Sequence, residues 1–265
     1  MDRGTSDGQI EAMVFLHDIH KSFGEKAVLR GLNLAVFQGD TVVIVGGSGT
    51  GKSVTLKHII GLLKPDKGHV YTAGTDLCCL STFELNRIRR RFGMTFQEGA
   101  LFDSMSVFDN VAFPLRRHTT MTDAEIAYRV QECLEMVHLH GVDGKRPSEL
   151  SGGMRRRVGF ARAISLEPEI LLFDEPTTGL DPVMGDVVAD IIIEMDERLK
   201  TTSVTITHDM KVAFKIADRI AMIHDGVLIE EGTPAEFKAT ANPIVQQFIE
   251  GTAKGPMTEG ANGER

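Results

Sequence analysis

Cysteine, long apolar runs and an excess of positive charge are all scarce in this chain of 265 residues. The adjacent Cys78 and Cys79 do not suggest a disulfide framework, and no cysteine forms a C-x-x-C pair, so reduced thiols are expected throughout. No stretch approaches the roughly 18 uncharged apolar residues of a membrane-spanning helix, and residues 1–11 lack the apolar core of a signal peptide. We therefore expect a soluble protein that meets membranes only through a partner. The net charge of −8 gives no reason to expect nucleic acid as a partner.

A glycine-rich stretch is the most informative feature that is present. It follows the apolar run 41–45, precedes a helix expected over 54–63, and reads Gly46-Gly47-Ser48-Gly49-Thr50-Gly51-Lys52-Ser53. Glycines are needed because successive backbone N–H groups must face one anion, and side chains would block its approach. The helix that follows adds the positive end of its dipole. This stretch predicts a nucleoside triphosphate site in which Lys52 reaches the β- and γ-phosphates and the Ser53 hydroxyl binds magnesium.

Four more polar residues stand where expected strands end: Gln97, Asp174, Glu175 and His208. Ligands bind at the carboxyl ends of strands in an open parallel sheet, so these side chains can converge on one nucleotide. Asp174 directly follows the apolar run 170–173 and is the expected magnesium partner. Glu175 is a candidate base for a water in line with the γ-phosphate. A surface acid before a turn is the alternative for Glu175, and a packing or helix-capping histidine is the alternative for His208.

A second glycine pair opens another expected helix at Ser151-Gly152-Gly153, with Ser151 as its cap. The pair gives the chain a second helix start that can bind an anion. Since the first loop already holds the phosphates, this second start makes most sense if it closes on a nucleotide held by another subunit.

The order of expected elements predicts an α/β fold with a helical insertion. Strands are expected at 14–19 and 32–37, and a hairpin at Asp225-Gly226. A capping box, Thr122 with Glu125, opens an apolar stripe at helical spacing. The expected divisions are a tail at 1–12, a nucleotide-binding domain at 13–250 with a helical region at about 98–165, and a Gly-rich tail at 251–265 that is disordered or orders on a partner.

Some residues have two interpretations. Phe23 lies between two expected strands, and composition alone favours a core position over stacking on a base. Arginines crowd near the end of a helix expected at 81–91, and Arg155, Arg156 and Arg157 follow the second glycine pair. Such clusters are most often solvated helix faces, although the second could touch a partner.

Together these stretches resemble the nucleotide-binding subunit of ABC transporters, in order and spacing, over roughly residues 13–232. Gly46 to Ser53 is similar to Walker A, Ser151-Gly152-Gly153 to the family signature, Ile170 to Glu175 to Walker B with the catalytic glutamate, Gln97 to the Q-loop, Gly179 to Asp181 to the D-loop, His208 to the switch histidine, and Phe23 to the base-stacking aromatic of the A-loop.

The resemblance implies a P-loop ABC cassette: a mainly parallel core, an N-terminal antiparallel β subdomain and a helical insertion subdomain. It implies ATP and Mg²⁺ as cofactors, with Glu175, His208 and Gln97 in hydrolysis and with Ser53, Gln97 and Asp174 at the metal. It also implies a base-stacking role for Phe23 in place of a core position. Two subunits would pair head to tail, each ATP held by Walker A of one chain and Ser151-Gly152-Gly153 of the other.

Two departures from the common pattern are similar to one branch, the Mla/Mkl-type ATPases. Met154 follows Gly153 at the position where many members carry glutamine, and three arginines come after it. The stretch 96–115 also resembles that branch. The branch implies phospholipid movement between bacterial membranes, a place at the cytoplasmic face of the inner membrane, and a membrane permease, an MCE-domain protein and sometimes a STAS-type protein as partners. An importer ATPase for amino acids or another small solute is the alternative. A soluble ABC ATPase acting on DNA or ribosomes is disfavoured, because those usually carry two cassettes or a long coiled-coil insert.

Overall fold

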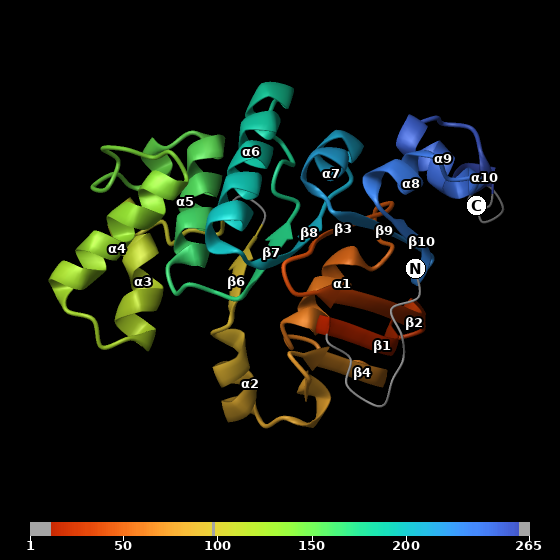
Figure 1. The fold of residues 1–265 in the computed structure, drawn as a ribbon, viewed down its shortest axis with the longest axis horizontal. Helices are drawn as coiled ribbons and strands as arrows, with labels where there is room; N and C mark the ends of the chain where they lie inside the picture. Colours follow the sequence, from red (N-terminus) through yellow and green to blue (C-terminus); the bar gives the residue numbers. More distant parts are fainter. Residues whose placement is uncertain (1–11, 97–98, 260–265) are drawn as a thin grey trace.

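A twisted six-stranded sheet forms the centre of the computed structural model, which describes residues 12–96 and 99–259 (Figure 1). Its strand order is β10-β9-β3-β8-β7-β6, and every neighbouring pair is parallel except β10 with β9. All residues of β3 and β8 are buried, as expected for parallel strands covered on both faces. The strands are β3 (Thr41–Val45), β6 (Phe92–Thr95), β7 (Ile170–Asp174), β8 (Thr202–Ile206), β9 (Arg219–His224) and β10 (Val227–Gly232).

An antiparallel sheet built from the N-terminal part of the chain packs beside this one, in the order β2-β1-β4-β5 (Figure 1). Its first two strands form a hairpin that is much longer than the sequence indicates. The Arg30 N–H donates to the Gly226 carbonyl at 2.9 Å and joins the two sheets. The strands are β1 (Ala12–Phe23), β2 (Lys26–Phe37), β4 (Lys67–Thr72) and β5 (Thr75–Asp76). The expected combination of a parallel core with an antiparallel β subdomain is confirmed.

Two hydrophobic cores lie on opposite faces of the central sheet, and β3 contributes alternate residues to them. Val42 and Ile44 belong to the core that contains the antiparallel sheet and α1 (Lys52–Ile59). Val43 and Val45 belong to the core beneath the other helices. Side chains alternate along a strand, so the four apolar residues of this five-residue strand anchor both halves of the molecule.

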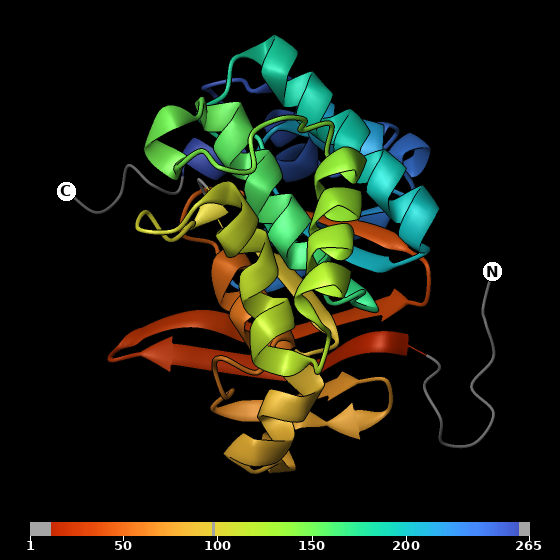
Figure 2. The same cartoon turned by 90° about the vertical axis from the view of Figure 1, so that its left-hand side faces the viewer.

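The helical region stands at one side of the central sheet, and its yellow-green to green helices face the viewer in Figure 2. It comprises α3 (Val107–His118), α4 (Asp123–Met136) and α5 (Gly152–Ile164), with a 3₁₀ turn, η3 (Pro147–Glu149), before α5. Pro114 lies inside α3. The predicted capping box is present, since Thr122 and Glu125 each bond the other's backbone N–H.

Helices α6, α7, α8 and α9 each start at a side-chain cap. Asp181 caps α6, its carboxylate accepting from two N–H groups of the first turn, and Thr233 caps α8. These helices are α6 (Pro182–Leu199), α7 (Met210–Ile216), α8 (Pro234–Lys238) and α9 (Pro243–Glu250); on the antiparallel side lie η1 (Leu77–Cys79) and α2 (Thr82–Arg89). Within the described part of the chain, no helix is both long and apolar enough to cross a bilayer.

The sequence predicts a C-terminal tail that is disordered or orders on a partner, whereas as far as residue 259 the segment packs on the chain itself. It forms α10 (Pro256–Glu259), which packs on α9: the Met257 N–H donates to Gln247 Oε1 at 2.8 Å. The Met257 side chain reaches the glycine-rich loop, because a Cβ on Gly47 would lie 3.8 Å from Met257 Cε. Residues 1–11 and 260–265 lie outside the described residues.

The arginine cluster at 155–157 is not a solvated face, which corrects the sequence interpretation, whereas Arg87 and Arg90 of the other cluster are exposed as expected. Arg155 and Arg157 donate to the carbonyls of Leu150 and His138, at 2.8 and 2.9 Å. Arg156 is buried and donates to the Thr178 carbonyl. In the other cluster, two members likewise have fixed partners: Arg89 donates to the Gly61 carbonyl at 2.6 Å, and Arg91 bonds Glu169 through both carboxylate oxygens. Guanidinium groups supply several donors in a fixed fork, so they can satisfy carbonyls at loop ends that no helix or strand pairs.

Candidate functional site

The glycine-rich loop between β3 and α1 has a backbone that side chains would not permit. Gly46 and Gly51 have φ of 149° and 104°. A Cβ on Gly46 would lie 2.2 Å from the Ile223 carbonyl oxygen, and one on Gly51 would lie 2.7 Å from Leu29 Cδ2. The loop therefore needs glycine both for its dihedral angles and for space, as an anion-binding turn at a helix start does.

Lys52 is folded over this loop. Its Nζ donates to the carbonyls of Gly46 and Gly47, at 2.8 Å each, and the residue is only 8% exposed. Burial lowers the pKa of the Lys52 ammonium, and the nearby carboxylates Glu175 and Asp174 partly oppose that shift. Neutral carbonyl oxygens are its only hydrogen-bond partners among the described residues. A buried ammonium held in this way is suited to an incoming anion.

Ser53 and Asp174 meet although they are far apart in the sequence. The Ser53 hydroxyl donates to Asp174 Oδ1 at 3.3 Å, where β7 ends next to the start of α1. Burial raises the pKa of the Asp174 carboxyl, and the hydrogen bond from Ser53 opposes that shift. A hydroxyl oxygen and a carboxylate oxygen are the hard donors that Mg²⁺ prefers, so the donor set fits this ion.

Glu175, the next residue, adopts φ of 51°, a left-handed conformation that is uncommon for a residue with a side chain. Its N–H donates to the Ile206 carbonyl at 2.9 Å, which fixes the turn against the end of β8. Its Oε2 lies 2.9 Å from His208 Nδ1 and accepts from the Thr178 hydroxyl, also at 2.9 Å. Two contacts to Oε2 thus hold the carboxylate in place, and the left-handed backbone of Glu175 sets the direction of its side chain.

Thr178 is a member of this group that the sequence did not reveal. It lies three residues after Glu175 in the turn before α6, and no charge or motif distinguishes it from the neighbouring Thr177. The structure brings Lys52, Ser53, Asp174, Glu175 and His208 to one edge of the sheet, as the argument from strand ends predicts. Gln97 lies outside the described residues.

The second glycine pair is not part of this cluster. Ser151 caps α5 as expected, its Oγ accepting from the Met154 N–H at 3.3 Å. Within the described residues, no hydrogen bond or ion pair joins Ser151, Gly152 or Gly153 to the glycine-rich loop. Figure 1 shows α5 in the helical region and α1 near the middle of the sheet. One copy of the chain therefore carries two separate helix starts.

Phe23 lies at the tip of the β1–β2 hairpin and is 50% exposed. The core position that composition favours is therefore wrong. Lys21 Nζ lies 5.8 Å from the centre of its ring, while the rest of the ring is open to a planar partner.

A phosphate-type loop, a buried lysine, a hydroxyl–carboxylate pair and an acid held by a histidine define a P-loop nucleotide hydrolase. The sequence matches the ABC transporter family over residues 29–178. It is 43% identical to an intermembrane phospholipid transport ATP-binding protein, MlaF of Haemophilus influenzae, over 88% of this chain and 89% of that protein. It is 42% identical to a probable ribonucleotide transport ATP-binding protein, mkl of Mycobacterium leprae, over 89% of this chain and 68% of that protein.

Solved structures of ABC cassettes are similar to this chain in both fold and sequence. The dimeric bacterial ABC transporter cassette MJ0796 superposes with a TM-score of 0.78 at 34% identity, covering 84% of this chain and 99% of that one. A dimeric post-hydrolysis state of the same cassette, bound to ADP and Pi, gives 0.77 at 35% identity over the same shares. The chain belongs to the ABC transporter family and is an ATPase of that family.

Proposed function

We propose that this chain is the ATP-hydrolysing subunit of a transporter that moves phospholipid between bacterial membranes. The observation that carries the proposal is the cluster of Lys52, Ser53, Asp174, Glu175 and His208 in a chain that shares 43% identity with an MlaF protein along most of both lengths. The ATPase of Escherichia coli that bears the same name is 38% identical over 92% of this chain.

Each residue of the cluster has a task in hydrolysis. The N–H groups of the glycine-rich loop bind the phosphates, and Lys52 exchanges its two carbonyl partners for phosphate oxygens. Ser53 and Asp174 would hold Mg²⁺, which neutralises charge on the β- and γ-phosphate oxygens when bound. Glu175 accepts a proton from the attacking water, while Thr178 and His208 hold the carboxylate in position. Phe23 would stack on the base, and Gln97 would be a further residue that holds Mg²⁺.

The second helix start has a task only in a pair of chains. Ser151, Gly152 and Gly153 of one copy would close on the nucleotide held by the glycine-rich loop of the other. The two related cassette structures are described as dimeric, which supports this arrangement. ATP then acts as part of the interface, and its hydrolysis releases the pair, which is a ligand-controlled two-state switch.

Partners would convert this switch into transport. We expect an integral membrane permease at the cytoplasmic face of the inner membrane, together with an MCE-domain lipid-binding protein and, in some assemblies, a STAS-type protein. The exposed Phe102 and Phe113, whose rings are 5.0 Å apart near the start of the helical region, are suited to receive a permease helix.

A reconstituted complex tests the substrate. The complex is purified from native membranes through a tag on this chain and placed in vesicles that contain fluorescent phospholipid. We expect ATP-dependent phospholipid transfer to acceptor vesicles, and none when Glu175→Gln replaces the wild-type chain. A complex that instead accumulates labelled ribonucleotide, or that co-purifies with a solute-binding protein and moves no lipid, would reject the phospholipid assignment and favour a small solute, as the name of the mkl relatives suggests.

A further inference from the structure

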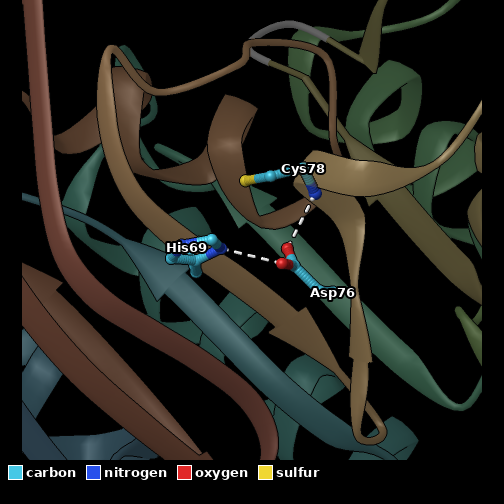
Figure 3. A group of neighbouring side chains, drawn as sticks. All are labelled: His69, Asp76 and Cys78. Carbon is cyan, nitrogen blue, oxygen red and sulfur yellow. Dashed lines mark hydrogen bonds and ion pairs between the residues drawn. The ribbon is translucent and has the colours of Figure 1, made fainter.

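A group of metal-ligating side chains lies on the antiparallel sheet, where nucleotide chemistry gives it no task. His69 in β4, Asp76 in β5 and Cys78 in η1 each offer one ligand atom, and these atoms all lie within 4.8 Å of one another. Figure 3 shows the three side chains converging on one point from the two sides of a hairpin. Imidazole nitrogen, carboxylate oxygen and thiolate sulfur are the three ligand types found in zinc sites.

The hairpin itself creates this convergence. Tyr71 pairs with Asp76 across the two-residue turn 73–74, whose φ values of 44° and 75° are those of a tight turn with both residues left-handed. His69 lies two residues before Tyr71 on β4, so its side chain emerges on the same face of the sheet as that of Asp76. Cys78 follows in η1, the 3₁₀ turn that Asp76 caps, and its thiol lies within 4.8 Å of the other two ligand atoms.

The carboxylate is already oriented between the other two groups. Asp76 Oδ1 accepts the Cys78 N–H at 2.9 Å, and Asp76 Oδ2 lies 2.7 Å from His69 Nδ1. The bond from the Cys78 N–H orients the carboxylate as outer hydrogen bonds orient ligands in metal sites, whereas the His69–Asp76 bond joins two ligands and would open when an ion enters between them. Tetrahedral zinc, with bonds of about 2.0–2.3 Å, requires ligand separations of about 3.3–3.8 Å. The group needs only small side-chain adjustments to meet that requirement.

Access and local bonding also favour an ion. The His69 side chain is 50% exposed and that of Asp76 is 21% exposed, so a hydrated cation can enter. A structural His–Asp pair would account for two of the three residues but gives the thiol no role. The Cys78 sulfur makes a long contact, 3.9 Å, with the Gly68 carbonyl, and it also interacts with Asp76 and with the Val70 backbone. Cys79 also touches Asp76, at 3.4 Å, but does not belong to the group of three.

We propose that His69, Asp76 and Cys78 bind a divalent transition ion of the zinc class, with its remaining position open to water, and that the ion ties η1 to β4. The ion is bound by the thiolate, so binding releases the thiol proton. The proposal is independent of nucleotide chemistry, because it uses none of the residues at the glycine-rich loop.

Cobalt titration of the full chain, freed of metal by a chelator and carrying no affinity tag, tests the site. Co²⁺ bound by a thiolate gives a charge-transfer band in the near ultraviolet, which the oxygen ligands at Ser53 and Asp174 cannot produce. We expect this band with one equivalent of Co²⁺, its displacement by Zn²⁺, and a rise in melting temperature when Zn²⁺ binds. Cys78→Ser should abolish the band, and His69→Asn should weaken Co²⁺ binding at least about tenfold.

Three controls make the result decisive. Cys79→Ser removes the neighbouring thiol, and His17→Asn removes an imidazole paired with His69 across β1 and β4; both should keep the band. Asp76→Asn retains a side-chain oxygen to cap η1 while it removes the carboxylate, so a loss of affinity there reports ligation and not unfolding. A wild-type chain without the band, a band that persists in Cys78→Ser, or one that depends on Cys79 would each overturn the proposal. ATPase activity confirms that every variant has folded.

Discussion

The two helix starts that we propose as anion sites, at α1 and at α5, differ in what surrounds them. The start of α1 is surrounded by side chains from the ends of β7 and β8, so Lys52, Ser53 and Asp174 form a cluster within one copy. The start of α5 has its own cap, Ser151, but no catalytic neighbour among the described residues. One start is therefore surrounded by the polar cluster within its own chain, whereas the other would form a site only under the proposal that a second copy completes it.

The two starts also differ in what holds them in place. The first follows the fully buried strand β3, and two of its glycines, Gly46 and Gly51, have no room for a side chain. The second is held by arginines, since Arg155 donates to the Leu150 carbonyl and Arg156 to the Thr178 carbonyl. The bond from Arg156 connects the start of α5 to the turn that contains Thr178. The Thr178 hydroxyl in turn donates to Glu175, three residues earlier in the same turn. A movement of the helical region can therefore be transmitted to the turn of Glu175 and Thr178 through the Arg156 guanidinium.

The largest effect should come from removing the base at the α1 start. Glu175→Gln keeps the shape of the side chain but cannot accept a proton, so hydrolysis should fall by about 10²–10⁴. ATP binding should persist and trap the closed pair, as a dimer peak in size-exclusion chromatography with ATP. Glu169→Gln, at the other end of β7 in an ion pair with Arg91, is the matched control and should leave phosphate release unchanged. A monomer peak with wild-type hydrolysis would contradict the role given to Glu175.

The second prediction separates the two helix starts by mixing variants. Lys52→Ala and Ser151→Arg should each inactivate the homodimer, because every shared site then contains one damaged half. A mixture of the two variants contains heterodimers in which one site pairs an intact loop with an intact α5 start. Phosphate release should therefore recover in the mixture, in proportion to the heterodimers formed. Failure to recover would mean that both starts act within one chain.

The third prediction concerns nucleotide affinity alone. Lys52→Ala removes a charged donor to the phosphates, and such bonds contribute about 1.5–3 kcal/mol, so ATP should bind at least about tenfold more weakly in calorimetry. Ser151→Ala should not change the affinity of the monomer, since its half of the site lies on the other copy. Lys64→Ala, an exposed lysine beyond α1, controls for the loss of a positive charge. Equal affinity in Lys52→Ala and wild type would contradict the loop assignment.

The smallest expected effect is on stability. The pKa of Asp174 is raised by burial, so its contribution to folding is complete below the model-peptide value of 3.8 and is lost as the pH rises through the folded value. At neutral pH, Asp174→Asn should raise the melting temperature of the nucleotide-free chain by about 2–4 °C, a gain that disappears in acid. Hydrolysis should be lost in the same variant.

Asp186 provides a control of opposite sign. The Lys215 ammonium lowers the pKa of Asp186, so its contribution is present above 3.8 and is lost as the pH falls through the folded value. Asp186→Asn should therefore destabilise the chain slightly at neutral pH. A pH-independent effect for both variants, measured by thermal unfolding from acid to neutral pH, would contradict the electrostatic explanation.

What could be predicted from the sequence is local in origin. The run 41–45, the glycines after it and Lys52 lie next to one another in the chain, so spacing alone identifies strand, loop and helix. Asp174 could be predicted as a site residue for the same reason, since it directly follows an apolar run. The meeting of Glu175 with His208 needed one further rule, that parallel strands end at a common edge.

What could not be predicted depends on contacts between distant segments. A threonine three residues after a glutamate is common, so Thr178 carries no signal until the turn is folded. A run of arginines in the sequence does not indicate which backbone carbonyls elsewhere in the chain will accept hydrogen bonds from it, as the His138 carbonyl does from Arg157. The polar composition of 251–265 did not predict the helix α10, which is held by the hydrogen bond from the Met257 N–H to the Gln247 side chain.

The contact between α10 and the glycine-rich loop makes Met257 a place from which to observe the site. The chain has no tryptophan, so Met257→Trp would introduce a single indole, anchored through its backbone N–H and adjacent to Gly47. Its emission spectrum would shift with the polarity of that surface as the loop fills and empties. A position at the far end of the chain thus becomes an intrinsic optical readout of each turnover.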